Sequence, residues 1–344
     1  MVIKVYDQRD LKNNLDVMNE HEDKTLIRKG IDKMIYTVTL NPALDYVIHL
    51  KAGLELGETN RSTGEEHYFG GKGINVSVIL KRLGTPSRVL GFVAGYTGEA
   101  IVQGIMAEGL DDDMIRLKNG ASRINVKIKS EDETEINANG PEIAPDELEQ
   151  LMSRLDEIGE GDVLVLAGSI PKSVPADIYL KMLQRVEGKG VLTVVDASGE
   201  VLKQALPLKP FLIKPNLAEL SGIFGCEPKG DAEVLQYAKK LQELGAKNVL
   251  VSLGSEGALL LSEEGTAWKI GVPVRDRVNT VGSGDSMVAG FLSGYLKSHD
   301  MKEALILGSA AASATAMSPG LADQAKILDM EKRILRGDAG IAEI

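Results

Sequence analysis

Short apolar runs alternate with amphipathic stretches along most of this 344-residue chain. The runs with the length and composition of buried strands are 35–40, 163–167, 191–195, 211–213 and 249–253. Between them, residues 175–186 and 231–244 show the spacing of helices with one buried face. Strands and helices in alternation form a parallel sheet covered on both faces. The sequence therefore predicts an α/β fold, with ligand sites beyond the carboxyl ends of the strands.

The pattern changes at two places. Residues 1–33 are charged and irregular, and we interpret them as an N-terminal extension of unassigned role: an added segment, an upstream start or a partner-binding arm. A single domain is predicted from residue 34 to residue 335. Polar segments near 45–69 and 120–137 interrupt the alternation, and part of the second has the two-residue period of a half-exposed strand. They predict a small β-sheet lid inserted into the domain.

Composition excludes several classes of protein. With 50 acidic and 39 basic residues and a net charge of -11, a general nucleic-acid surface is not expected. The single cysteine, Cys226, allows no internal disulfide and fits a reducing compartment. No apolar stretch approaches the roughly 20 residues of a membrane span, and the N-terminus lacks a signal-peptide core. A cytoplasmic protein without nucleic-acid or membrane partners is predicted.

The segment Asn279-Thr-Val-Gly-Ser-Gly-Asp-Ser-Met-Val-Ala289 places a glycine turn and a carboxylate where a helix is predicted to begin. Unpaired N–H groups at a helix start attract anions, and Gly282 and Gly284 allow close approach to the backbone. Phosphate is the expected guest. Asp285 would repel it, which indicates a general base that takes a proton from an attacking hydroxyl. The alternative is that Asp285 only caps the helix.

A second glycine cluster lies in Phe69-Gly-Gly-Lys-Gly-Ile-Asn75. It is not a P-loop, because Gly73 follows Lys72 where that motif needs Ser or Thr. Glycines ahead of a predicted helix at 74–83 still form an anion pocket, with Lys72 as a point charge and Asn75 as a partner for hydroxyls.

Two further strand ends carry polar turns. In Lys214-Pro-Asn-Leu-Ala-Glu219, an amide and a carboxylate three residues apart share one side of a first helical turn. Such oxygen ligands suit magnesium, while a capping box between Asn216 and Glu219 is the structural alternative. Ser252-Leu-Gly-Ser-Glu-Gly257 follows a predicted strand and, together with the loop of Asp285, could hold the phosphates and ribose of a nucleotide.

Taken together, these segments resemble the ribokinase-like (PfkB) carbohydrate kinases, whose signatures are Gly-Gly-Lys-Gly-x-Asn and Gly-Ala-Gly-Asp. The resemblance runs from Met34 to about Asp329. Thr39-Leu-Asn-Pro-Ala-Leu-Asp45, Gly70-Gly-Lys-Gly-Ile-Asn75 and Arg123-Ile-Asn-Val126 are similar to the sugar-phosphate branch, especially the bacterial 1-phosphofructokinases. One departure is Ser283, which replaces the alanine of the second signature. We expect it to be tolerated, because backbone donors bind the anion.

The resemblance implies a Rossmann-like core with a β-sheet lid and transfer of the γ-phosphate of ATP, with Mg²⁺, to a sugar hydroxyl. Asp285 occupies the position of the family's general base, and the backbone of Gly282, Ser283, Gly284 and Asp285 occupies the position of its anion hole. Substrate-binding positions are Asp45, Gly70, Gly71, Lys72, Asn75, Arg123 and Ser169, with Arg123 as the clamp on the sugar's existing phosphate. Nucleotide positions are Lys214, Ser252, Gly254, Ser255, Glu256, Gly257, Thr280 and Gly284, and magnesium positions are Asn216 and Glu219, acting through water. The resemblance also implies a homodimer.

The hypothesis is that fructose 1-phosphate presents its 6-hydroxyl to Asp285 and the γ-phosphate, so that the product is fructose 1,6-bisphosphate. Tagatose 6-phosphate and fructose 6-phosphate are alternative substrates for the same chemistry. A non-catalytic sugar-phosphate or nucleotide sensor is an alternative of another class. A dehydrogenase is disfavoured, because no Gly-x-Gly-x-x-Gly follows the first strand. Residues 91–98 loosely resemble a dinucleotide turn, but their glycine spacing differs, and we interpret them as a strand-to-helix turn.

Overall fold

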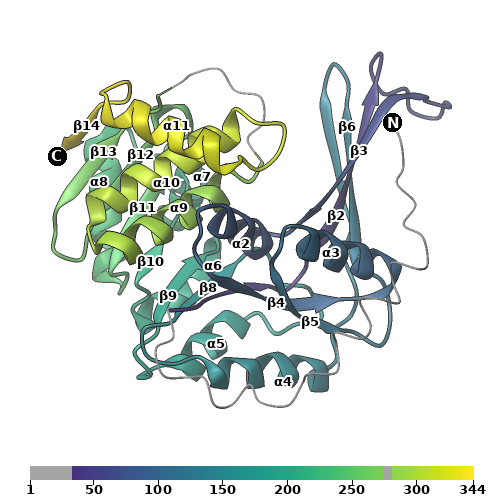
Figure 1. Cartoon of the computed structure of the whole chain (residues 1–344), viewed down its shortest axis with the longest axis horizontal. Coiled ribbons are helices and arrows are strands. Elements are labelled where there is room, and N and C mark those ends of the chain that lie inside the picture. The colour runs from purple at the N-terminus through teal and green to yellow at the C-terminus, as the bar shows by residue number, and fades with distance from the viewer. Residues whose placement is uncertain (1–32, 274–280) are drawn as a thin grey trace. The chain divides into compact units, whose positions relative to one another are not determined.

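A ten-stranded sheet forms the centre of the computed structural model, which describes residues 33–273 and 281–344 (Figure 1). Its strands are β1 (Ile35–Thr39), β4 (Ser87–Val93), β5 (Asp111–Arg116), β8 (Val163–Ala167), β9 (Leu192–Asp196), β10 (Leu212–Ile213), β11 (Asn248–Ser252), β12 (Ala258–Leu261), β13 (Ala267–Ile270) and β14 (Ile341–Glu343). They lie in the order β14-β13-β12-β11-β10-β9-β8-β1-β4-β5. From β11 to β5 all neighbours are parallel, whereas β12, β13 and β14 continue the sheet in antiparallel pairs. The predicted α/β class is confirmed.

Helices cover both faces of this sheet, as the strand–helix alternation requires. They are α2 (Lys72–Arg82), α3 (Gly95–Ala107), α4 (Pro145–Arg154), α5 (Ile178–Val186), α6 (Gly199–Ala205), α7 (Leu217–Phe224), α8 (Gly230–Glu243), α9 (Ser283–Ser298), α10 (Met301–Ala316) and α11 (Gln324–Leu335). Single-turn 3₁₀ helices lie at Leu155–Glu157, Leu206–Leu208 and Gly254–Glu256. None of the helices within 33–273 and 281–344 has the length and hydrophobicity needed to cross a bilayer.

The hydrophobic core has a layer on each side of the sheet. On one side, α4, α5, α6, α7 and α8 pack against the sheet, with Tyr179 and Met182 of α5 fully buried. On the other side, α2, α9, α10 and α11 pack against the sheet, with Phe291 of α9 fully buried. A third cluster joins α2 and α3 to β4 and to the edge strand β5. Figure 1 shows α4 and α5 on the side of the sheet opposite α2. Because α2 and α9 are anchored in these layers, their N-termini are held at fixed positions.

A separate four-stranded sheet forms the lid. Its strands are β2 (Ala43–Leu50), β3 (Ser62–Gly70), β6 (Arg123–Lys129) and β7 (Glu133–Asn137), in the order β3-β2-β6-β7. β2 follows directly after β1, and β3 leads into α2, so the lid grows from the carboxyl end of a central strand (Figure 1). β2 and β6 are parallel, with Asp45 beside Asn125. The predicted inserted β lid is confirmed.

The glycine turn before α2 depends on close packing against β1. Gly71 has φ 148°, and an added Cβ at Gly73 would lie 2.8 Å from the carbonyl oxygen of Val38. The backbone N–H of Ile74 donates to Oγ1 of Thr39 at 3.1 Å. The start of α2 is therefore fixed against the carboxyl end of β1. The helix begins at Lys72, two residues earlier than the pattern at 74–83 predicted.

Candidate active site

Asp285 lies in the first turn of α9, in a cavity between the lid and the carboxyl ends of the parallel strands. Gly282 caps this helix with φ 79°, a left-handed conformation that favours glycine. The carboxylate is only 6% exposed, and Nδ2 of Asn75 donates to its Oδ2 at 2.8 Å. Burial, followed by the neighbouring Asp196 carboxylate, raises the pKa of Asp285 to about 6. The hydrogen bond from Asn75 and the charges of Lys72 and Lys214 act in the opposite direction.

Two lysines share one buried carboxylate beside Asp285. Nζ of Lys72 lies 3.3 Å from Oδ2 of Asp196, and Nζ of Lys214 lies 3.4 Å from Oδ1. Asp196 is 1% exposed, and burial of its charge is tolerable because it faces these two cations. Although burial lowers the pKa of Lys72, the carboxylates of Asp196, Asp285 and Glu219 raise it overall. Lys72 is therefore held as a cation, and both lysines line the cavity.

The start of α9 provides backbone donors for an anion. The N–H groups of Ser283, Gly284 and Asp285 belong to the first turn, where a helix offers no carbonyl partner. An added Cβ at Gly284 would lie 3.1 Å from Nζ of Lys214, so the ammonium group adjoins this turn. Backbone donors, the positive end of the helix dipole and a lysine cation thus converge on one place.

The lid supplies the opposite wall of this cavity, which we call the lid cavity and which has a volume of about 430 Å³. Its lining includes Asp45, Arg123 and Asn125 of the lid together with Lys72, Asn75 and Asp285 of the main domain. Arg123 is half-buried, and its Nε donates to the carbonyl oxygen of Asn41 at 3.1 Å. That bond fixes the guanidinium at its Nε. Burial lowers the pKa of Arg123, and Asp45 opposes the change.

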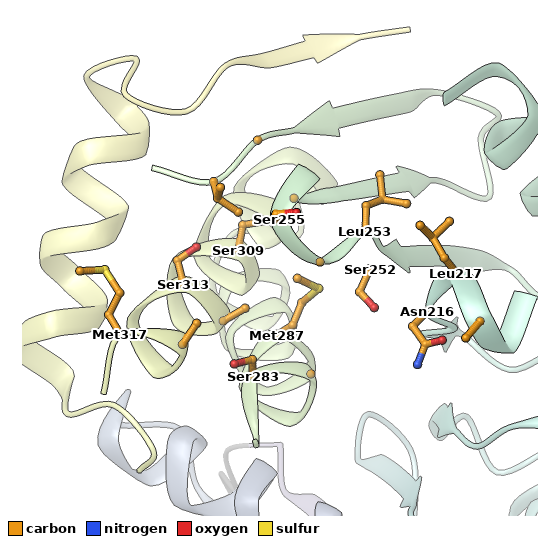
Figure 2. Close-up of a pocket in the computed structure, with 18 residues that line it drawn as sticks. Asn216, Leu217, Ser252, Leu253, Ser255, Ser283, Met287, Ser309, Ser313 and Met317 are labelled. Carbon is orange, nitrogen blue, oxygen red and sulfur yellow. The ribbon is translucent and has the colours of Figure 1, made fainter. Parts of the chain in front are cut away.

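A second, mostly apolar cavity of about 470 Å³ lies on the other side of the α9 N-terminus, and we call it the apolar pocket (Figure 2). The end of β11 and the turn after it contribute one wall, with Ser252, Leu253, Gly254, Ser255 and Gly257. Figure 2 shows Ser309 and Ser313 of α10 on one side and Ser252 and Asn216 on the other, with Met287 of α9 between them. The apolar pocket and the lid cavity share Asn216, Ser252 and Gly284. A ligand in one can therefore reach the other beside the anion-binding turn.

Most residues predicted from the sequence line these two cavities, although they come from distant segments. Asp45, Gly70, Gly71, Lys72, Asn75, Arg123, Lys214, Gly282 and Asp285 line the lid cavity. Two predicted residues, Ser169 and Glu256, are exposed and line neither the lid cavity nor the apolar pocket. The loop of Ser169 nevertheless adjoins Lys72, since an added Cβ at Gly168 would lie 3.8 Å from that side chain. Thr280 lies outside the described residues.

Asn216 and Glu219 form the capping box that the sequence allowed. Oδ1 of Asn216 accepts from the N–H of Glu219 at 2.8 Å, and Oε2 of Glu219 accepts from the N–H of Asn216 at 2.9 Å. Among the described residues no group of three or more His, Cys, Asp and Glu side chains could hold a metal ion. Both residues line the lid cavity, so a role for their remaining oxygens with magnesium through water stays a prediction.

The sequence reasoning missed Asp196 and Asn125. Asp196 ends β9, so the carboxylate directly after the apolar run at 191–195 was the available signal. Asn125 lies within the segment Arg123-Ile-Asn-Val126, and its two-residue spacing from Arg123 places both on one face of β6. Neither pattern identifies a site residue by itself, because it does not show which side chains lie beside it on the neighbouring strands.

Comparisons with known proteins agree with this geometry. A family model described as pfkB family carbohydrate kinase matches residues 38–327. A 1-phosphofructokinase of Bacillus subtilis is 46% identical over 84% of this chain and 94% of its own length. A D-tagatose-1-phosphate kinase of Bacillus licheniformis is 36% identical over 86% of this chain and 96% of its own. A structure of the tetrameric inhibited form of phosphofructokinase-2 from Escherichia coli has a TM-score of 0.81 at 29% identity, covering 89% of this chain and 100% of that one.

Proposed function

The chain belongs to the pfkB family of carbohydrate kinases, and from this premise we propose that it transfers the γ-phosphate of ATP to fructose 1-phosphate. The products are fructose 1,6-bisphosphate and ADP. The observation that carries the proposal is the junction of the two cavities at Gly284, beside Asp285. A nucleotide in the apolar pocket would direct its terminal phosphate toward this junction, and a sugar phosphate in the lid cavity would present its hydroxyl from the other side.

Asp285 acts as the general base in this proposal. The sugar's 6-hydroxyl oxygen forms the new bond to the γ-phosphorus, the bond from that phosphorus to the bridging oxygen of ADP breaks, and the hydroxyl proton passes to the carboxylate. A pKa of about 6 leaves Asp285 mostly ionised at neutral pH while making it a better proton acceptor than an ordinary aspartate. Burial thus supports the catalytic role over a purely capping role.

The cations and donors around Asp285 stabilise the transferring phosphate. The backbone N–H groups of Ser283, Gly284 and Asp285 and the ammonium groups of Lys72 and Lys214 would bind its oxygens. Asp196 positions both lysines, because each ammonium group lies within 3.4 Å of one of its oxygens. Magnesium, held through water by Asn216 and Glu219, would neutralise charge on the nucleotide phosphates. An oxygen-rich turn that lines the lid cavity is chemically suited to that ion.

The lid binds the sugar phosphate. Arg123 would clamp the 1-phosphate with the two terminal nitrogens of its guanidinium, since its Nε is already bonded to Asn41. Asp45 and Asn75 would orient sugar hydroxyls over Gly70 and Gly71. Closure of the lid would exclude water and so favour transfer to the sugar over hydrolysis.

Tagatose 1-phosphate is the second candidate substrate, because a relative 36% identical to this chain is a D-tagatose-1-phosphate kinase. It differs from fructose 1-phosphate in the configuration of a single hydroxyl. Tagatose 6-phosphate and fructose 6-phosphate, whose incoming hydroxyl is the 1-hydroxyl, require the same catalytic groups. A non-catalytic sensor is disfavoured by a buried, perturbed carboxylate at the cavity junction.

The test is a coupled kinase assay with fructose 1-phosphate, tagatose 1-phosphate, fructose 6-phosphate, tagatose 6-phosphate and unphosphorylated fructose. Fructose 1-phosphate is expected to give the highest kcat/KM. Asp285→Asn should lower kcat about 10²- to 10⁴-fold and leave nucleotide affinity largely unchanged. The matched control is Asp300→Asn, an exposed aspartate that caps α10, which should turn over normally. Near-normal turnover by Asp285→Asn would show that another group takes the proton.

The assembly proposed for this kinase is a homodimer. The proposal rests on the family resemblance, in which inserted lids pair between subunits. The inhibited form of phosphofructokinase-2 from Escherichia coli is described as tetrameric, so a tetramer is the alternative assembly. Light scattering of the purified protein should give the mass of two 36.9 kDa chains, and a monomer or tetramer mass would contradict the proposal.

A further inference from the structure

Asn125 occupies the middle of β6 on the face of the lid that closes the lid cavity. Residues two apart on a strand share a face, so Arg123, Asn125 and Lys127 point to the same side. The parallel register places Asn125 directly beside Asp45 of β2. Asn125 is only 7% exposed, which is unusual for an amide on a small sheet with otherwise polar surroundings.

The orientation of the Asn125 amide is fixed by its neighbour. Nδ2 of Asn125 donates to Oδ1 of Asp45 at 2.9 Å. The reversed amide would bring two oxygen acceptors together at that distance, so the network allows one orientation. Asp45 is itself restrained, because Nζ of Lys127 lies 3.6 Å from its Oδ2 and 3.6 Å from Oε1 of Glu135. The amide oxygen of Asn125 is therefore held in a defined direction.

That oxygen lacks a hydrogen-bond donor. Within residues 33–273 and 281–344, Oδ1 of Asn125 is buried and meets no partner. Buried side-chain acceptors are normally satisfied, and leaving one unpaired destabilises the fold. An unpaired acceptor on the wall of a ligand cavity that also contains Arg123 and Asp285 indicates that a donor arrives with the ligand. Sugar hydroxyls are such donors.

We propose that Asn125 determines sugar specificity: its Oδ1 accepts a hydrogen bond from a ring or chain hydroxyl of the sugar phosphate, and its Nδ2 positions Asp45 for a neighbouring hydroxyl. The proposal rests on the kinase function given above and adds a substrate contact to it. Asp45 and Asn125 form a rigid pair of acceptors on adjacent strands. Such a pair is satisfied only by a sugar that has two hydroxyls in the matching positions. An isolated flexible side chain could adjust to several positions.

The physical consequence is discrimination against sugars that lack the hydroxyl. A deoxy sugar leaves the buried oxygen of Asn125 without a donor and with no access to water, so the penalty exceeds the loss of one exposed contact. An unpaired buried acceptor corresponds to about a 5- to 150-fold loss in kcat/KM. Removing the amide by mutation should lower kcat/KM for the sugar that carries the hydroxyl, and so reduce the preference for that sugar over its deoxy analogue.

The experiment compares wild type, Asn125→Ala and Asn137→Ala on fructose 1-phosphate and its 3-deoxy and 4-deoxy analogues. Asn137 is the matched control, because it lies opposite Asn125 on β7 and is exposed. Wild type and Asn137→Ala should disfavour one deoxy analogue by about 5- to 150-fold. Asn125→Ala should lose a larger factor on fructose 1-phosphate, mainly through KM, than on that analogue, for which only the positioning of Asp45 is lost.

Equal losses by Asn125→Ala on all three sugars would overturn the proposal, since they would reveal a purely structural role. Wild-type enzyme that treats the three sugars alike would overturn it without any variant, which covers an Asn125→Ala protein that does not fold. If wild type prefers another sugar phosphate of the kinase panel, the proposed substrate is wrong, and the deoxy analogues of that sugar decide the role of Asn125. Failure of the function and failure of this proposal are thus separate results.

Discussion

The hydrogen bond between Asn75 and Asp285 should set the pH at which this kinase loses activity. Nδ2 of Asn75 lies 2.8 Å from Oδ2 of Asp285 and lowers a pKa that burial and Asp196 raise to about 6. A hydrogen bond to a charged group contributes at least about 1.5 kcal/mol, and 1.36 kcal/mol corresponds to one pKa unit. Asn75→Ala should therefore raise the pKa of Asp285 by about one unit, to about 7.

The assay is kcat/KM for the sugar phosphate between pH 5.5 and 8.5, because this quantity reports the titration of the free enzyme. A general base must be deprotonated, so activity falls as the pH drops through its pKa. With a pKa of about 6, wild type should be about twofold faster at pH 8 than at pH 6. Asn75→Ala, with a pKa of about 7, should be about tenfold faster at the higher pH. The substrates' phosphates also titrate near pH 6, but they do so equally for both enzymes.

The pH ratio is the decisive quantity, because Asn75 also contacts substrate in our proposal and its loss will lower kcat/KM at every pH. Asn137→Ala, exposed on β7, serves as the control and should retain the wild-type ratio. If Asn75→Ala kept the twofold ratio, or if its acid limb moved to lower pH, then Asp285 would not be the titrating base or this bond would not govern it.

Two further outcomes follow from the same geometry. Because the pKa of Asp285 is raised from 3.8 to about 6 in the folded state, its ionisation destabilises the fold increasingly as pH rises through that interval. Asp285→Asn should therefore raise the free energy of unfolding by about 3 kcal/mol at pH 8 and about half as much at pH 5, measured by urea denaturation; a pH-independent difference would contradict this. Arg123→Ala should raise KM for the sugar phosphate about 10- to 100-fold with little change in KM for ATP, and similar changes in both would show that Arg123 is not the clamp.

The strand and helix pattern was predictable because it depends on neighbours in sequence. Apolar runs such as 163–167 match β8, and the glycine turn before Asp285 does begin a helix. The sequence also allowed the capping box of Asn216 and Glu219, a local motif of three residues. Boundaries differ by one to three residues: α5 begins at Ile178 where the pattern suggested 175, since helix ends depend on local turns more than on periodicity.

Most residues that line the two cavities were predicted from the sequence one by one, but their relations were not. Asn75 and Asp285 are 210 residues apart and still share a hydrogen bond. In the sequence, Asp196 looks like any other carboxylate at the end of a strand. The structure shows that it forms ion pairs with two lysines, Lys72 and Lys214. Ser169, similar in motif to a substrate residue, proves exposed.

Local rules alone therefore determined the α/β class, the inserted lid and the glycine-rich helix starts, because hydrophobic period and glycine spacing act within a few residues. Only the tertiary structure decided the pKa of Asp285, the pairing of Lys72 and Lys214 on one carboxylate and the direction of the Asn125 amide. Burial and charge interactions depend on distance in space, and that distance is set by how β1, β9 and the lid strands assemble.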